Sequence, residues 1–333
     1  MKSIRLLFLF LIFLQFSCTS QHKKINGVSF VASGDSITTK HIQPVVKVNS
    51  NSVALMPFAY VRGLNSPKVN YNFQRQWFGE TPKGIKQYAN EFKKKNISVM
   101  LKPQIWVSRG AFTGFIEMKS EDDWKVLEQT YSDFILLFAK VAKDIDAEVF
   151  CVGTELEKFL LARPNYWRNL IKEIKKIYKG KLTYAANWDE FRRVPFWDAL
   201  DFIGIDAYFP ISDKKSPSIK ELELGWQKHK TTINKVRTKF NKPVLFTEYG
   251  YRSVDYTAKE PWNFDRVNKG VNHDAQVNSL KVIYNQFWKE EWFAGGYIWK
   301  WFVRHERVGG LNDNRFTPQN KPAEQTLKEL YAN

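Results

Sequence analysis

The chain is poor in the residues that build disulfide frameworks and metal sites. It has 333 residues but only two cysteines, Cys18 and Cys151. No Cys-x-x-Cys, His-x-His or His-Glu-x-x-His spacing occurs, and the five histidines are scattered along the chain. These absences argue against a disulfide scaffold, a structural zinc ion and a catalytic metal. We therefore expect the protein to work without a metal or another cofactor, and Cys151 to be an inert buried residue.

A glycine-rich phosphate loop and a recognisable nucleic-acid-binding motif are also missing. The formal net charge is nevertheless +17. The lysines concentrate on the predicted helix faces that lie opposite the apolar residues, which is the ordinary position of solvated charge. We expect no nucleic-acid partner. The charge would also suit an anionic polysaccharide or a membrane surface, although neither is required.

The N-terminus lacks an apolar run long enough to span a membrane. The run from Leu6 to Leu14 has nine residues, whereas a spanning helix needs about 20. A basic start followed by a short apolar run is typical of a secretory signal. The Ser17-Cys18 pair resembles the cleavage site of bacterial lipoproteins, although Gln15 stands where an aliphatic residue is usual. Residues 1–17 are predicted to be a signal peptide with lipidation at Cys18; an ordinary signal peptide with an incidental cysteine is the alternative.

This leader predicts the location of the protein. After export, residues 18–26 would form a tether and residues 27–333 a single catalytic domain. Because no acidic cluster follows the cysteine, we favour a membrane-anchored lipoprotein on the periplasmic side over one on the cell surface. The lipid would be the only contact with the membrane, and we expect a monomer.

The rest of the chain alternates between apolar runs and amphipathic segments. The eight predicted strands are Gly27–Ala32, Ser52–Ala59, Ser98–Ile105, Ala147–Thr154, Leu182–Ala186, Phe202–Ala207, Val244–Thr247 and Gly295–Trp299. Most are apolar throughout, as is typical of parallel strands buried on both faces. Predicted helices lie between them; Ser120 caps one, and Pro82 and Pro322 begin two others. Eight strand–helix units predict a (β/α)8 TIM barrel, since the alternative, a doubly wound open sheet, would carry a phosphate loop.

Two glutamates directly follow predicted strands. Glu155 ends the fourth strand and Glu248 the seventh, and the active sites of such barrels lie at this end. With regular alternation, Glu155 lies on the face of Gly153, and Glu248 on the face of Val244 and Phe246. We expect these faces to line the barrel, so that both carboxylates meet at one rim. Cleavage of a glycosidic bond needs such a pair, one protonated and one ionised.

Four motifs in barrel order resemble glycoside hydrolase family 113, which belongs to the large clan of retaining (β/α)8 glycosidases and is described as endo-β-1,4-mannanases. The motifs are Gln76-Trp77-Phe78-Gly79-Glu80, Gly153-Thr154-Glu155-Leu156, Thr183-Tyr184-Ala185-Ala186-Asn187-Trp188 and Phe246-Thr247-Glu248-Tyr249-Gly250-Tyr251-Arg252-Ser253. The resemblance implies that Glu155 is the acid/base, that Glu248 is the nucleophile, and that the substrate is a β-linked oligo- or polysaccharide, with β-1,4-mannan favoured. Thr154 departs from the clan, where an asparagine holds the 2-hydroxyl of the sugar, so the identity of the sugar stays open.

Polar residues at other strand ends would complete this site. Lys102 and Gln104 follow the third strand, and a lysine inside a barrel is costly unless it is paired or solvated. Lys102 is predicted to contact a carboxylate or a sugar hydroxyl, with a structural ion pair as the alternative. Asn187 ends the fifth strand and offers a donor and an acceptor to hydroxyl groups.

The resemblance adds Tyr208, at the end of the sixth strand, as a hydrogen-bond donor to the nucleophile. Arg252 follows Glu248 by four residues and would bind substrate or neutralise Asp255. Several tryptophans also fall just past strand ends, where an indole can lie under a sugar ring. These are Trp77, Trp106, Trp188 and Trp299. Any single one is more typical of a core residue, but together they predict one or two stacking platforms.

Parts of the sequence also suggest other functions. Ser36, in Gly34-Asp35-Ser36-Ile37-Thr38, resembles the nucleophile block of GDS(L)-type esterases, and residues 310–313 mimic a second block of that family. The Asp-x-x-His that such an esterase needs is absent, which argues against this reading. A carbohydrate-binding barrel without catalysis, and a purely structural envelope protein, are the two remaining alternatives.

Overall fold

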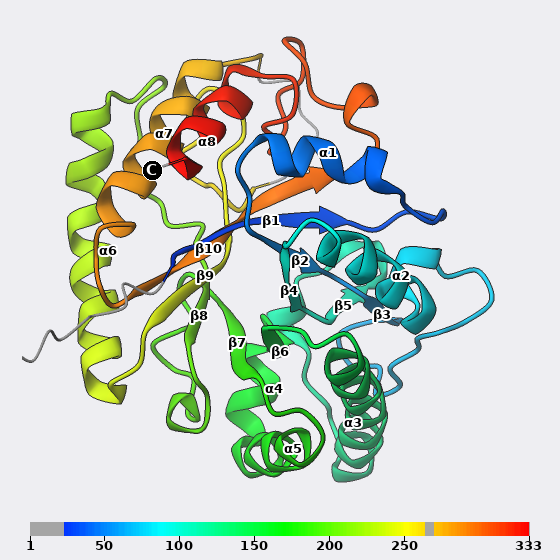
Figure 1. Cartoon of the computed structure of the whole chain (residues 1–333). Helices are drawn as coiled ribbons and strands as arrows, with labels where there is room; N and C mark the ends of the chain where they lie inside the picture. Colours follow the sequence, from blue (N-terminus) through cyan, green and yellow to red (C-terminus); the bar gives the residue numbers. More distant parts are fainter. Residues whose placement is uncertain (1–22, 264–269, 333) are drawn as a thin grey trace, which may run out of the picture.

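The computed structural model describes residues 23–263 and 270–332, and it forms a closed barrel of eight parallel strands surrounded by helices (Figure 1). The order around the barrel is β1-β10-β9-β8-β7-β6-β4-β2. Their bounds are β1 Ile25–Val31, β2 Ser52–Leu55, β4 Ser98–Leu101, β6 Val149–Thr154, β7 Lys181–Asn187, β8 Ile203–Asp206, β9 Val244–Tyr249 and β10 Phe293–Phe302. The predicted (β/α)8 barrel is therefore confirmed.

Two of the predicted strands are each divided into two. Pro57 follows β2, and Pro103 follows β4. Proline has no backbone N–H to donate to a neighbouring strand, so each strand is interrupted there. Beyond these prolines the chain forms β3 (Phe58–Val61) and β5 (Gln104–Val107), which pair with each other outside the barrel. Lys102 lies between β4 and β5, directly before Pro103.

The helices fill the connections, as the sequence predicts. Their bounds are α1 Thr39–Lys47, α2 Pro82–Lys93, α3 Glu121–Asp144, α4 Glu157–Ala162, α5 Pro164–Ile177, α6 Ile219–Phe240, α7 His273–Phe287 and α8 Pro322–Tyr331, with short 3-10 turns at Phe78–Glu80, Ser108–Gly110, Thr113–Phe115, Trp197–Ala199 and His305–Arg307. The expected cap of α3 is present, because Ser120 Oγ accepts from Asp123 N at 3.1 Å. Helix α6 begins earlier than the sequence suggests, where Ser218 and Glu221 form a capping box. No helix in the described ranges is long and apolar enough to cross a membrane.

The apolar core has two layers, one inside the barrel and one between the strands and the helices. The inner layer consists of Ile25, Ala54, Met100, Val149, Leu245 and Tyr297. Phe246 lies in the outer layer, with its ring 4.8 Å from that of Phe287 on α7. The expectation that the face of Val244 and Phe246 lines the barrel is therefore wrong, because Leu245 occupies that position.

The N-terminal boundary also differs from the expectation. Strand β1 begins at Ile25, so the last two residues of the proposed tether belong to the barrel. Lys24 Nζ donates to the carbonyl oxygens of Glu290 at 2.7 Å and Phe293 at 2.5 Å, which fixes the start of the strand. The signal peptide, Cys18 and residues 19–22 lie outside the described residues.

Candidate active site

Glu248, at the end of β9, is surrounded by hydrogen-bond donors. Tyr208 OH donates to its Oε2 at 2.7 Å, and Gln104 Nε2 donates to its Oε1 at 3.1 Å. Lys102 Nζ also donates to Oε1. Donors to both oxygens stabilise an ionised carboxylate and fix its orientation. Burial and the nearby charge of Glu248 raise the pKa of Tyr208 well above its ordinary value, so its hydroxyl stays protonated and can donate.

Lys102 is fully buried and bridges Glu248 to a second carboxylate, that of Asp206 on β8. Its Nζ lies 3.2 Å from both Asp206 oxygens, and Thr247 Oγ1 donates to Asp206 Oδ1 at 2.7 Å. Burial alone would lower the pKa of Lys102, but the two carboxylates raise it above its ordinary value, so the ammonium stays charged. Burial and the charge of Glu248 raise the pKa of Asp206 to about 7.

Glu155 has a different environment. It follows β6 in a left-handed backbone conformation with φ of 50°, and its N–H donates to Ala185 O at 2.8 Å. Burial, followed by the negative charges of Asp206 and Glu248, raises the pKa of Glu155 well above its ordinary value. Within the described ranges no side chain or backbone group hydrogen-bonds to its carboxyl group. A carboxyl group with a raised pKa and no hydrogen-bond donor favours its protonated form, which is the form that a general acid needs.

A buried network supports the backbone beside Glu155. Tyr184 OH donates to Glu190 Oε1 at 2.6 Å and accepts from the N–H of Leu156 at 2.6 Å. The second oxygen of Glu190 accepts from Asn187 N at 2.9 Å. Glu190 is completely buried, and burial raises its pKa to about 8. The chain around the acid is therefore joined to β7 and to the loop that follows it.

Both carboxylates reach the barrel mouth because their strands are irregular. The register between β8 and β9 shifts so that Asp206 pairs with Glu248, which brings the adjacent Thr247 and Glu248 side chains to the same buried cluster. A similar shift between β6 and β7 precedes Glu155. A Cβ on Gly153 would meet Trp167 and Tyr131, so Gly153 faces the helices. The charge of Glu248 acts on Glu155, and neither strand follows the regular alternation that the sequence suggests.

Sequence reasoning missed three of the buried polar residues in this region. They are Asp206, Glu190 and Tyr184. A lone acid inside the apolar run Ile203–Ala207 was the available signal for Asp206, since an unpaired carboxylate there would be costly. No sequence feature marks Tyr184 and Glu190 in this way, because their hydrogen bond forms only when the loop after β7 folds.

The tryptophans predicted to bind sugar differ in exposure. Trp77 is 55% exposed and Trp106 48% exposed, whereas Trp188 and Trp299 are partly buried. Trp188 stacks on Trp262, with ring centroids 5.0 Å apart and an angle of 16° between the planes. Trp262, which follows β9 in the chain, is a further exposed indole that the sequence did not single out. Sugar stacking on these rings stays a prediction.

Arg252 and Asn187 are engaged with backbone groups. Arg252 is buried, and its guanidinium donates to the carbonyl oxygens of Asn314 at 3.2 Å and Asn263 at 3.5 Å. Asp255, its proposed partner, pairs instead with Lys215 at 3.5 Å. Asn187 Oδ1 accepts from the N–H of Trp188 at 2.9 Å. Arg252 thus links two loops at the mouth, and a substrate contact from either residue stays a prediction.

Ser36 does not belong to a catalytic triad in the described part of the chain. It lies exposed in the loop before α1, and no histidine there hydrogen-bonds to it. Asp313, in the second esterase-like block, pairs with Lys321 at 2.6 Å. Across residues 23–263 and 270–332, no group of three or more His, Cys, Asp or Glu side chains is placed to hold a metal ion. Burial raises the pKa of the Cys151 thiol to about 11, which keeps it neutral.

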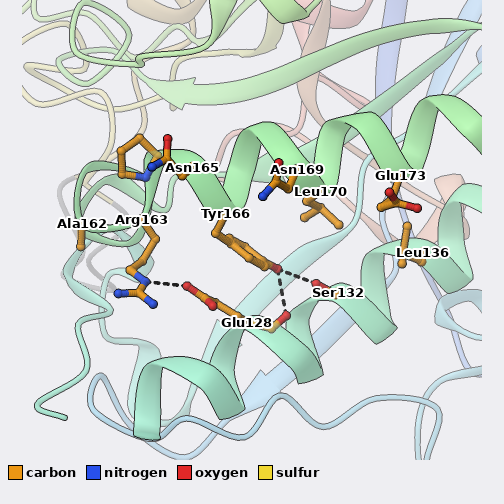
Figure 2. Close-up of a pocket in the computed structure, with 11 residues that line it drawn as sticks. Glu128, Ser132, Leu136, Ala162, Arg163, Asn165, Tyr166, Asn169, Leu170 and Glu173 are labelled. Carbon is orange, nitrogen blue, oxygen red and sulfur yellow. Dashed lines mark hydrogen bonds and ion pairs between the residues drawn. The ribbon is translucent and has the colours of Figure 1, made fainter. Parts of the chain in front are cut away.

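A surface hollow also lies away from these carboxylates, between the outer helices α3 and α5 (Figure 2). Its polar residues bond mainly to one another. Arg163 donates to Glu128, and Tyr166 OH donates to the carbonyl oxygen of Glu128 at 2.9 Å. Ser132 Oγ lies 2.8 Å from the same hydroxyl. These contacts join the two helices.

The chain is similar to proteins of one glycosidase family. The model of Glycoside Hydrolase Family 113 matches residues 33–321. No relative was found among curated proteins. A β-mannanase of the same family from Alicyclobacillus acidocaldarius, solved in complex with ManMIm, is 24% identical, with a TM-score of 0.81 over 93% of this chain and 97% of that one. A second family 113 β-1,4-mannanase is 23% identical, with a TM-score of 0.80 over 93% and 99% of the two chains.

A more distant structure shares the barrel alone. It is a β-glucuronidase from Faecalibacterium prausnitzii, 14% identical, with a TM-score of 0.62. The alignment covers 93% of this chain but only 49% of that one. At such identities the solved structures establish the fold and no more.

Proposed function

The chain belongs to glycoside hydrolase family 113, and from this premise we propose that it hydrolyses β-1,4-mannan with retention of the anomeric configuration. The observation that carries the proposal is the contrast between its two carboxyl groups. Glu248 is held by three donors, while burial and nearby negative charges raise the pKa of Glu155 well above its ordinary value. One nucleophile and one acid are what a retaining glycosidase requires.

In the first step, a Glu248 oxygen attacks the anomeric carbon of the sugar. The bond from that carbon to the leaving oxygen breaks, and the proton of Glu155 moves to the oxygen. In the second step, Glu155 takes a proton from water, the water oxygen bonds to the anomeric carbon, and Glu248 leaves as a carboxylate. Because the carbon is attacked twice from opposite sides, the product keeps the β configuration.

Mannan is proposed as the substrate because the family 113 structures that resemble this chain are named β-mannanases. Trp77, Trp106 and Trp299 would supply apolar surfaces for sugar rings. Thr154 replaces an amide with a shorter hydroxyl beside the acid, and its Oγ1 donates to Pro103 O at 3.4 Å. The contact with the 2-hydroxyl would therefore differ from that of the wider clan.

The test is digestion of a panel of β-1,4-mannan, glucan and xylan oligosaccharides, with products sized by mass and the first-formed anomer identified by NMR. We expect cleavage of the mannan series with β products. Initial α products would contradict retention, and preferential cleavage of glucan or xylan would contradict the substrate. Binding without any release of reducing ends would instead favour a non-catalytic carbohydrate-binding barrel.

We also propose that the protein is exported and anchored by lipid at Cys18, on the periplasmic side of a membrane, where it would act as a monomer on imported oligosaccharides. The support is the leader sequence alone. The test is fractionation of cells that produce the wild type or Cys18→Ala. The wild type should be in the membrane fraction with an acylated N-terminal cysteine, and the variant should be soluble. A soluble wild type without acylation would contradict the anchor.

A further inference from the structure

Lys300 is a second lysine at the barrel mouth, and its surroundings are unlike those of Lys102. It lies on β10 directly after Trp299, and both side chains are partly buried. Its ammonium lies 5.3 Å from the centre of the Trp299 ring and 5.1 Å from that of the Phe302 ring. In the described part of the chain, no carboxylate and no carbonyl oxygen bonds to this ammonium. Two aromatic rings therefore hold a cation that has no anion of its own.

Ile298 on β10 pairs with Tyr249 on β9, which places Lys300 just beyond this pair, at the end of the barrel where Glu248 lies. Burial lowers its pKa, the charge of Glu248 opposes this effect, and the charge of Arg315 adds to it. Glu248 already receives three donors from other residues. Arg315 is exposed, and its guanidinium has no ion-pair partner among the described residues. Asp313, an acid of the same loop, is paired with Lys321.

Lys300 is thus a partly buried cation without a counter-charge at the mouth of the barrel. A cation that is partly removed from water is costly unless an anion accompanies it. A neutral mannosyl chain offers hydroxyl groups only. An acidic sugar would supply the missing negative charge, and the net charge of +17 would also attract an anionic chain in solution.

We infer that Lys300 binds a carboxylate on the sugar next to Glu248, so that the substrate is a β-linked chain that carries uronic acid residues. This inference rests on the proposed function, and it narrows the substrate from neutral mannan to its carboxylated form. Lys300 is then a specificity-determining residue. The uronate carboxylate would accept a charge-assisted hydrogen bond from the ammonium beside the Trp299 ring.

The experiment compares two substrates of equal length and linkage, β-1,4-mannohexaose and the same chain with its C6 carbons present as carboxylates. We expect kcat/KM of the wild type to be about tenfold to a hundredfold higher on the acidic chain, the range expected for one hydrogen bond between charged groups. Lys300→Met should reduce this preference by about the same factor, and Lys300→Arg should retain most of it. The preference should also decline as salt is raised.

Lys289→Met is the matched control, because Lys289 is exposed just beyond α7 and its loss removes the same charge from a remote position. It should leave the preference unchanged. Thermal unfolding of each variant checks that the fold is intact.

Each outcome has one meaning. A wild type that cleaves only the neutral chain, or cleaves both equally, overturns the inference and leaves the proposed function standing. Equal losses on both substrates in Lys300→Met also overturn it, since Lys300 would then act through Glu248 and not on the substrate. Failure to cleave either chain refutes the proposed function, and the inference with it.

Discussion

The two glutamates that end β9 and follow β6 influence each other's charge but have opposite hydrogen-bond surroundings. Glu248 receives donors from Tyr208, Gln104 and Lys102. Glu155 receives none within the described ranges, and burial with two neighbouring carboxylates raises its pKa. The barrel thus gives two chemically identical side chains different surroundings by distributing hydrogen-bond donors unequally.

The buried cation reinforces this division. Lys102 is shared between Asp206 and Glu248 and makes no contact with Glu155 within hydrogen-bond distance. A single ammonium among three carboxyl groups leaves an excess of negative charge if all three ionise. Protonation of Glu155 relieves that excess, so the acid and the nucleophile depend on each other electrostatically.

The largest effects should come from removing either carboxylate. Glu248→Gln should lower turnover by roughly 10⁴-fold or more on any substrate, because the nucleophile is lost. Glu155→Gln should lower turnover by about 10²- to 10⁴-fold on an unactivated oligosaccharide, the contribution of a general acid. With a dinitrophenyl leaving group, which needs no proton, the first step of Glu155→Gln should be nearly as fast as in the wild type. Pre-steady-state release of dinitrophenol measures this difference.

The same pair of variants tests the pH dependence. Because the raised pKa of Glu155 keeps it protonated, wild-type kcat/KM on oligosaccharide should fall as alkaline pH removes that proton. Glu155→Gln with the activated substrate should show no such alkaline decline. If both variants lose the first step equally on the activated substrate, the assigned roles are wrong.

The next largest effect should follow Lys102→Met. The change leaves Asp206 and Glu248 buried without a cation, and breaking a buried pair on one side costs about 3–5 kcal/mol. We expect this loss in urea unfolding and about a 10²-fold lower kcat/KM. Lys86→Met is the control, since Lys86 pairs with Asp144 at the surface, where a pair contributes less than about 1 kcal/mol. Equal losses in the two variants would show that burial of Lys102 is unimportant.

A smaller effect is expected for Tyr208→Phe. This change removes one donor, at 2.7 Å, and keeps the ring that packs against Phe316. Loss of one hydrogen bond to a charged group corresponds to about a tenfold to hundredfold decrease in kcat. KM should change little if the bond orients Glu248 and not the substrate. A variant with unchanged kcat and a raised KM would make Tyr208 a substrate-binding residue instead.

The smallest effect on activity should come from Glu190→Gln, which supports the acid's backbone and not the reacting atoms. Its pKa is raised to about 8, so the folded state binds more protons than the unfolded state. Wild-type stability should therefore decrease as pH rises from the ordinary glutamate range towards 8, by up to about 1.4 kcal/mol per pH unit from this group. Glu190→Gln should flatten that decrease, as measured by urea unfolding across pH. An unchanged slope would show that Glu190 is ionised in the fold.

The sequence predicted the eight strands and both strand-end glutamates because apolar runs and the residues that end them are local features. Even the division of two strands has a local cause in Pro57 and Pro103. The family resemblance supplied the different roles of Glu155 and Glu248, which composition and spacing alone do not distinguish.

The buried partners could not be predicted in the same way. The bond between Lys102 and Asp206 joins residues that are 104 positions apart, and their pairing depends on barrel closure. The face of Glu248 depends on a register shift that moves Thr247 and Glu248 into one cluster, whereas regular alternation would place Glu248 with the outward-facing Phe246. Such shifts arise from packing across strands and leave no periodic pattern in the sequence.

Covalent trapping tests the central claim, that Glu248 is the nucleophile, most directly. The protein is incubated with a 2-deoxy-2-fluoro-mannoside that carries a good leaving group, and peptides of the trapped enzyme are sequenced by mass spectrometry. The account predicts one fluorosugar per chain, attached to the carboxylate of Glu248 and absent from Glu248→Gln. Attachment to Glu155 or Asp206, or rapid turnover without any covalent adduct and with inverted product, would contradict it.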